Sequence, residues 1–261
     1  MELELNGKVA LVTVANRGIS AAIATELARE VVYLCLVARD SAKRQEVADS
    51  LVKTANITVQ LLSADLRDPD APGQAVAAAV GHLGRLDLLV NNAGATKRAD
   101  FFALTEEDWQ DGFALKFHGG VRTTRAASPH LRAVNGGIVN IAGIGSRAGA
   151  AEFTIGGAVN VALLNFTKAM ADIGIQHSVR VNAINPGLIA TDRFTRNVER
   201  VMRERDFSYD EAMTFLVSSH GTTRIGQPEG IGALVACLAS SQADFIQGSL
   251  IDVDGGATRS L

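Results

Sequence analysis

The chain has 261 residues, of which 47% are hydrophobic and 20% are charged, and its formal net charge is −3. This composition is typical of a globular protein and excludes disordered, collagen-like and coiled-coil chains. At this length we predict a single domain over residues 1–261, with an ample core. Because both signs of charge are interspersed, we expect neither nucleic acid nor an anionic membrane surface as the main partner.

The cysteines and the apolar runs bear on the compartment. Cys35 and Cys237 each lie in an apolar run, which is more typical of core packing in a reducing compartment than of a disulfide. The first residues are acidic and do not resemble a secretory signal. No apolar run approaches the ~20 residues that a membrane span needs. We therefore predict a cytoplasmic protein that does not bind a membrane, and we predict no metal site.

Short β-branched apolar runs alternate with longer runs of helical pattern along the whole chain. In chain order, the pattern predicts a strand at 8–14, a helix at 20–30, a strand at 32–37, a helix at 41–54, a strand at 57–62, a helix at 69–82, a strand at 86–90, one or two helices over 106–133, a strand at 137–142, a helix at 151–174, a strand at 179–184, a helix at 229–239 and a strand at 249–253.

Strands that are apolar on both faces and separated by helices indicate a parallel sheet covered on both sides. We predict an α/β fold: a doubly wound, Rossmann-like domain with a seven-stranded parallel sheet and helices on both faces. Ligands of this architecture bind outside the carboxyl ends of the strands, so the residues just after each strand are the candidates for a site.

Residues 193–223 interrupt this rhythm with a helical, amphipathic segment. A long excursion after the sixth strand is typical of a lid over a ligand cleft, although a plain pair of surface helices explains the pattern equally well. Its phenylalanines and methionines point to an apolar small-molecule substrate. Its arginines are offset by acids, and we interpret them as a solvated face rather than an anion site.

Small and polar residues follow the predicted strands in a recognisable order. The first strand leads into a turn before a helix, where free N–H groups and the helix dipole favour a phosphate. The candidate residues are Thr13, Asn16, Arg17, Gly18 and Ile19 in that turn, Asp65 and Leu66 after the third strand, Asn92, Ala93 and Gly94 after the fourth, and Pro186, Gly187, Ile189 and Thr191 after the sixth.

Together with the closing Gly248-Ser249 and Val253-Asp254-Gly255-Gly256, these motifs stand in the order of the short-chain dehydrogenase/reductase family, which the chain resembles over essentially its whole length. The resemblance implies a dinucleotide cofactor held by the candidate residues. It also implies a homo-oligomer, because paired long helices commonly form subunit contacts in this family.

The residue after the second strand bears on which dinucleotide is bound. An acidic residue there binds the ribose 2′-hydroxyl of NAD, whereas an arginine accommodates the 2′-phosphate of NADP. This chain has Arg39 at that position and Arg17 beside the phosphate turn, so we predict NADP(H). Val14 and Ser20 stand where the family pattern has glycine, and a β-branched residue resists positive φ. We therefore expect cofactor binding to be weakened, altered or lost.

The catalytic positions differ from the family pattern. By the resemblance, the serine position is Gly143, the tyrosine position is Gly156, the lysine position is Asn160 and the asparagine position is Lys116. The last two are consistent with an exchange that leaves a cation and a carboxamide at one spot, although a solvated lysine and a locally bonded asparagine would explain them separately. Because glycine replaces the serine and the tyrosine side chains at these positions, we expect an enlarged pocket.

Three functions follow as hypotheses. The first is an oxidoreductase that uses NADP(H) to reduce a carbonyl or oxidise an alcohol at an atypical active site, with Lys116 and Asn160 as the catalytic candidates. The second is a non-redox enzyme on the same scaffold, such as a lyase, isomerase or hydrolase. The third is a catalytically silent binding protein. The fold alone does not choose among them.

Overall fold

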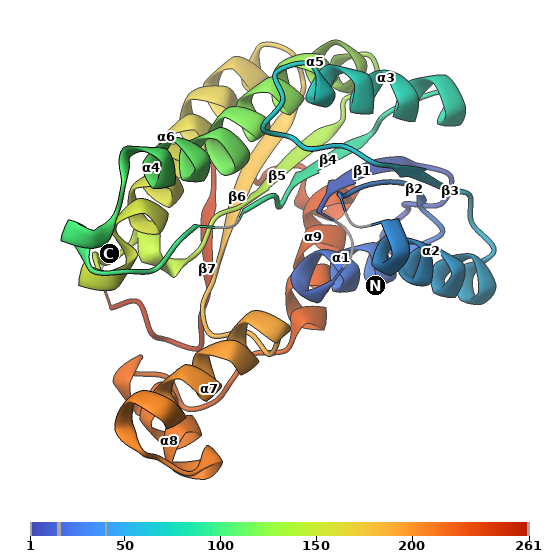
Figure 1. The fold of residues 1–261 in the computed structure, drawn as a ribbon. Helices are drawn as coiled ribbons and strands as arrows, with labels where there is room; N and C mark the ends of the chain where they lie inside the picture. The colour runs from blue at the N-terminus through green and yellow to red at the C-terminus, as the bar shows by residue number, and fades with distance from the viewer. Residues whose placement is uncertain (1, 15–16, 40, 95, 260–261) are drawn as a thin grey trace.

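The computed structural model describes residues 2–14, 17–39, 41–94 and 96–259, and these build one seven-stranded parallel sheet. The strand order is β3-β2-β1-β4-β5-β6-β7 (Figure 1). The predicted fold class is confirmed. The strands are β1 (Val9–Thr13), β2 (Tyr33–Val37), β3 (Val59–Leu62), β4 (Leu88–Asn91), β5 (Gly137–Ile141), β6 (Arg180–Pro186) and β7 (Leu250–Val253).

Helices cover both faces of this sheet, as Figure 1 shows. One apolar cluster joins the sheet to α1 and α9 with residues such as Leu27 and Val235, and the other joins it to α3 and α5 with residues such as Val76 and Leu131. The long helices are α1 (Gly18–Arg29), α2 (Ser41–Ala55), α3 (Ala71–Leu83), α4 (Glu106–Phe113), α5 (Gly119–Arg132), α6 (Thr154–Ile175), α7 (Asp192–Arg205), α8 (Tyr209–Ser219) and α9 (Pro228–Ala239).

The segment predicted as one or two helices at 106–133 consists of two helices with an irregular turn between them, and this turn contains Lys116. Helix α4 begins at a capping box in which Thr105 and Asp108 bond each other's backbone. Between α4 and α5 the chain forms a π-helical turn, Ala114–His118. Such turns interrupt the regular α-helical spacing and are frequent at functional sites. Here the turn carries Lys116.

The excursion after β6 consists of α7 and α8, which project beyond the end of that strand in Figure 1. These two helices share a small core around Val198, Val201 and Leu216, against which the phenylalanines and methionines of the segment pack. The apolar residues that pointed to an apolar substrate are therefore accounted for by packing within the helix pair. Whether the pair acts as a lid stays a prediction.

Within the described ranges, no helix is long and apolar enough to cross a membrane.

Candidate functional site

The carboxyl ends of β1 and β4 are tied together by one hydroxyl group. The Thr13 Oγ1 atom accepts hydrogen bonds from the backbone N–H of Asn92 at 2.8 Å and of Ala93 at 3.0 Å, and it donates to the carbonyl of Val90 at 3.2 Å. Because these neighbouring strands reverse the winding of the sheet, this edge is the topological switch point at which such folds bind ligands. Thr13 therefore shapes the site through the backbone that it holds.

The turn after β1 adopts the conformation that glycine favours, although it contains valine. Val14 has a φ of 59°, a left-handed conformation that is strained for a β-branched residue. Ser20 supports the turn: its hydroxyl donates to the carbonyl of Val14 at 2.6 Å and accepts from the Asn92 side chain at 2.8 Å. The two departures from the family pattern are thus part of one hydrogen-bonded unit.

The start of α1 provides a cradle for an anionic group. Arg17 precedes the helix, and its side chain makes no capping hydrogen bond, so it leaves the first N–H groups and the positive end of the helix dipole to another partner. Gly18 has a φ of 56°, and a Cβ atom there would lie 3.2 Å from the Thr191 methyl group. Two predicted cofactor residues from distant segments therefore lie together. Ile19 lies in the first turn of α1, while Asn16 lies outside the described residues.

A charged network lies beyond β2 and β3. Arg39 lies 3.5 Å from Asp65, and Arg67 lies 3.2 Å from the same carboxylate and also pairs with Asp111. Burial would raise the pKa of Asp65, but hydrogen bonds and charge from Arg67, with a smaller effect of Arg39, hold it below its usual value. Arg39 remains well exposed, so its guanidinium is available to a second anion.

The remaining predicted cofactor residues lie along the same edge of the sheet. Leu66 is buried against α5, where its carbonyl would lie 3.1 Å from a Cβ atom at Gly119. Pro186 ends β6. Gly187 follows it, and a Cβ atom there would lie only 2.8 Å from the Cα atom of Asp254. A larger residue would therefore push apart the segments that follow β6 and β7. Ile189 is buried.

Lys116 and Asn160 meet beside this edge. The Lys116 ammonium donates to the Asn160 Oδ1 atom at 2.6 Å and to the carbonyl of Ala142, just after β5, at 2.7 Å. The Lys116 side chain also passes over Gly94, where a Cβ atom would lie 3.0 Å from the lysine Cδ atom. The exchange inferred from the sequence thus brings a cation and a carboxamide into direct contact.

Burial changes the acidity of this lysine. Desolvation, with a further contribution from the positive charge of Arg193, lowers the pKa of Lys116 from 10.5 to about 7. At neutral pH both protonation states are then populated. The ammonium has a third N–H beyond its two hydrogen bonds, and the neutral amine has a lone pair in its place, so the same nitrogen can give or take a proton.

Neighbouring side chains occupy the space at Gly143 and Gly156, the serine and tyrosine positions of the family pattern. A Cβ atom at Gly156 would overlap the ring of Phe153, and a Cβ atom at Gly145 would lie 2.9 Å from that ring. At Gly143, which has a φ of 148°, a Cβ atom would lie 3.2 Å from the Asn160 Nδ2 atom. The expectation that the pocket is enlarged is therefore wrong at Gly156, because the ring of Phe153 fills the space that glycine leaves.

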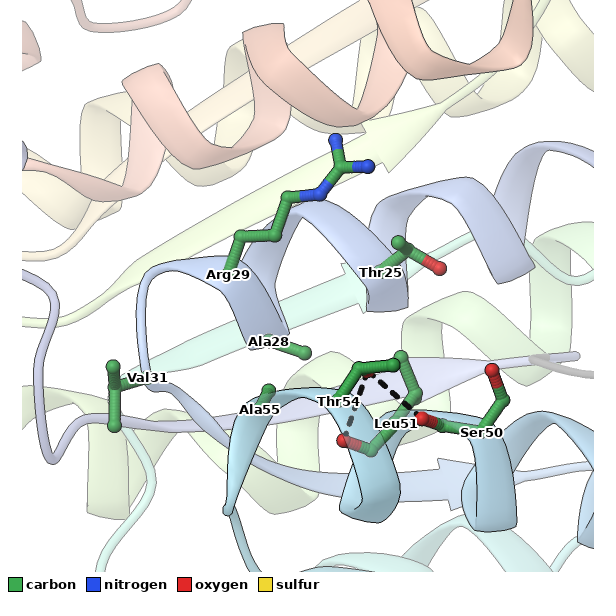
Figure 2. A pocket seen from close by; sticks show the side chains of 8 residues that line it. All are labelled: Thr25, Ala28, Arg29, Val31, Ser50, Leu51, Thr54 and Ala55. Carbon is green, nitrogen blue, oxygen red and sulfur yellow. Dashed lines mark hydrogen bonds between the residues drawn. The ribbon is translucent and has the colours of Figure 1, made fainter.

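A separate hollow lies between the ends of α1 and α2, lined in part by Arg29, Val31 and Thr54 (Figure 2). It is at the opposite end of the sheet from the residues described above, because the carboxyl ends of these helices return to the amino ends of the strands. The Thr54 hydroxyl is already bonded to the carbonyl of Ser50 at 2.8 Å. We interpret the hollow as a groove between packed helices.

Comparisons with known proteins agree with this architecture. A family model described as enoyl-(acyl carrier protein) reductase matches residues 14–258. An NADPH-dependent reductase of Bacillus subtilis is 32% identical over 260 residues, which cover 98% of this chain and 100% of the relative. The structure of L-sorbose reductase from Gluconobacter frateurii, complexed with NADPH and L-sorbose, has a TM-score of 0.95 at 30% identity and covers 100% of both chains. A short-chain dehydrogenase/reductase from Serratia marcescens has a TM-score of 0.85 at 31% identity, covering 97% of this chain and 99% of that one.

Proposed function

The chain belongs to the short-chain dehydrogenase/reductase family, and from this premise we propose that it is an NADP(H)-dependent oxidoreductase that reduces a carbonyl or oxidises an alcohol at an atypical active site. The observation that carries the proposal is the contact of Lys116 with Asn160, because it brings a proton-transfer group from the asparagine position of the family pattern to the residue at its lysine position. The homo-oligomer, the single domain and the cytoplasmic location stay predictions.

The residues at the switch point fit a dinucleotide. The N-terminus of α1 and Gly18 would hold the pyrophosphate, as helix N-termini do in this fold. Arg17 and Arg39 would pair with a 2′-phosphate, and Asp65 would lie towards the adenine. Residues 92–94 and 186–191 would line the nicotinamide end, with α7 and α8 as a lid above it. Binding of NADP(H) is supported by the L-sorbose reductase structure, a structural neighbour that was solved in complex with NADPH.

When bound, NADPH would supply the hydride that reduces the carbonyl carbon of the substrate. Lys116, as the ammonium, donates a hydrogen bond to the carbonyl oxygen and transfers a proton to it as the alcohol forms. In the reverse direction the neutral amine of Lys116 accepts the alcohol proton. Asn160 and the Ala142 carbonyl orient the lysine nitrogen through the bonds that they accept. Phe153 keeps water out of the space beside Gly156.

The direct test is a nucleotide titration followed by a turnover assay. Purified protein is titrated with NADPH while the nicotinamide fluorescence is followed and with NADP⁺ by calorimetry, and is then offered a panel of ketones and aldehydes. We expect saturable binding and NADPH consumption that depends on the carbonyl. No saturable binding would overturn the proposal. Binding with no turnover on the whole panel would instead support a silent binding protein.

The nucleotide preference gives a second test. Arg39→Asp removes a cation from the proposed 2′-phosphate position and adds an acceptor for a ribose hydroxyl. We expect the Kd for NADPH to rise about tenfold or more, because its 2′-phosphate loses a charged hydrogen bond. The Kd for NADH should fall, because its ribose 2′-hydroxyl gains a hydrogen bond to the carboxylate.

The matched control is Arg132→Asp, which makes the same charge change at an exposed residue at the end of α5. Its affinities for both nucleotides should stay at the wild-type values. If Arg39→Asp also left them unchanged in isothermal titration calorimetry, Arg39 would have no part in cofactor selection.

A further inference from the structure

Phe153 carries two arginines on its ring, next to the proposed catalytic pair. The guanidinium carbon of Arg98 lies 4.3 Å from the ring centroid, and that of Arg193 lies 5.7 Å from it. Arg98 comes from the loop after β4, whereas Arg193 is in the first turn of α7. Two segments far apart in the sequence therefore bring positive charge to one aromatic ring. We call Phe153, Arg98 and Arg193 the arginine platform.

Neither guanidinium of the platform forms an ion pair with a carboxylate of the described residues. Over residues 2–14, 17–39, 41–94 and 96–259, no ion pair or hydrogen bond involves the Arg98 or Arg193 side chain. The neighbouring cations differ: Lys97 bonds Asp108 at 2.7 Å, and Arg200 lies 3.8 Å from Glu152. The platform is thus a local excess of positive charge on a chain whose net charge is negative.

The charges of the platform act on one another and on the catalytic lysine. Desolvation lowers the pKa of Arg98, and the charges of Arg193 and Arg200 lower it further, against an opposing effect of Glu152. Desolvation and Arg196 lower the pKa of Arg193, which in turn lowers that of Lys116. Because arginine stays protonated in proteins, an anion that binds here would relieve this mutual repulsion.

We propose that the arginine platform binds an oxyanion on the substrate, a carboxylate or a phosphate, so that the enzyme acts on an anionic carbonyl compound or alcohol. Guanidinium groups match the oxygen pairs of carboxylates and phosphates, and stacking on Phe153 holds both groups in place before a ligand arrives. The assignment of the anion to the substrate rests on the proposed function. The anion site itself is argued only from the arginine platform. Arg193 is exposed, as expected for the arginines of its segment, and the proposal adds an anion as its ligand.

The first arm of the test measures binding without turnover. Benzoate is titrated calorimetrically into the wild type and into Arg98→Gln/Arg193→Gln. Inorganic phosphate is titrated in an Arg39→Asp background, which removes one of the two cations of the proposed 2′-phosphate position, and the double substitution is compared in that same background. We expect the double substitution to weaken binding of at least one anion about 30-fold, as the loss of charged hydrogen bonds does, and the comparison of the two anions identifies the preferred group. Arg203→Gln, an exposed residue of α7, is the control and should not change binding.

The second arm measures turnover on matched carbonyl pairs: para-formylbenzoate with its methyl ester, and glyceraldehyde phosphate with glyceraldehyde. We expect the double variant to lose about 30-fold in kcat/KM on the preferred anionic member only. Anion binding that depends on the platform, with no turnover of any carbonyl, would leave the site standing and overturn the oxidoreductase. The opposite result is turnover in which the double substitution changes neither anion binding nor kcat/KM on the anionic carbonyl compounds. This result would overturn the anion site and leave the oxidoreductase standing.

Discussion

Replacing Lys116 with methionine is expected to lower kcat by at least about 100-fold, because methionine fills similar space but carries no proton, and general acid–base catalysis contributes on that order. Binding of NADPH, followed by nicotinamide fluorescence, should stay near the wild-type value. Single-turnover and steady-state rates on a carbonyl that the wild type reduces provide the measurement. A wild-type rate in Lys116→Met would remove this lysine from the proposed mechanism.

The pH dependence gives the same lysine a signature that a structural role would not produce. With a pKa of about 7, the ammonium form that reduction needs is lost as pH rises through 7, so kcat for reduction should fall about tenfold per pH unit above that point. Oxidation needs the neutral amine and should rise with pH up to about 7 and then level off. Lys116→Arg keeps a charge but cannot release its proton, so any residual activity should lack this inflection.

Asn160 is a positioning residue in this scheme, and a conservative change at Asn160 should move the inflection. Asn160→Asp would place a carboxylate against the Lys116 nitrogen, where Oδ1 now lies 2.6 Å away. An opposite charge at this distance favours the ammonium, so the inflection should move up by about one unit or more. An unshifted profile in this variant would mean that another group titrates.

For stability, the largest effect is expected at Gly174, near the end of α6. A Cβ atom there would overlap the carbonyl oxygen of Val179 and lie 2.9 Å from the Gln247 Nε2 atom. That amide donates to the carbonyl of Ala171 at 2.8 Å and to that of Val179 at 3.2 Å. Gly174→Ala should therefore lower the free energy of unfolding by about 3 kcal/mol, since backbone and side chain must both move.

Gly81→Ala is the matched control, because Gly81 also lies in a helix, α3, and has no heavy atom within 4 Å of its Cβ position. Here alanine should raise the free energy of unfolding by about 0.5 kcal/mol or more, through helix propensity alone. Urea denaturation of both variants followed by circular dichroism measures the two effects. Equal midpoints would show that the contact at Gly174 is not the cause.

The sheet was predictable because its signal is local. Each strand is a short run that is apolar on both faces, such as Val9–Thr13 and Gly137–Ile141, and all ten of these residues are buried. The predicted boundaries of two helices differ from the observed ones, because turns precede those helices. Helix α1 begins at Gly18 rather than at residue 20, and α6 begins at Thr154 after a short 3-10 turn, Ala151–Phe153. Neither shift alters the order of the elements.

The candidate site was predictable only in part. The positions of Lys116 and Asn160 followed from the family resemblance, but their contact requires the π-helical turn that carries Lys116 to approach α6. The role of Phe153 could not be read from the chain, because a ring that folds over Gly156 from the preceding turn looks in the sequence like any aromatic residue before a helix.

The order of strands and helices followed from the sequence, and with it the edge of the sheet at which a ligand is expected, because apolar periodicity acts over a few neighbouring residues. The tertiary structure alone decided which charges meet. Arg98 and Arg193 are separated by five elements of the sheet and its helices, and only their approach to one ring turns two ordinary surface arginines into a candidate anion site. Packing between distant segments sets those contacts, and no local pattern records them.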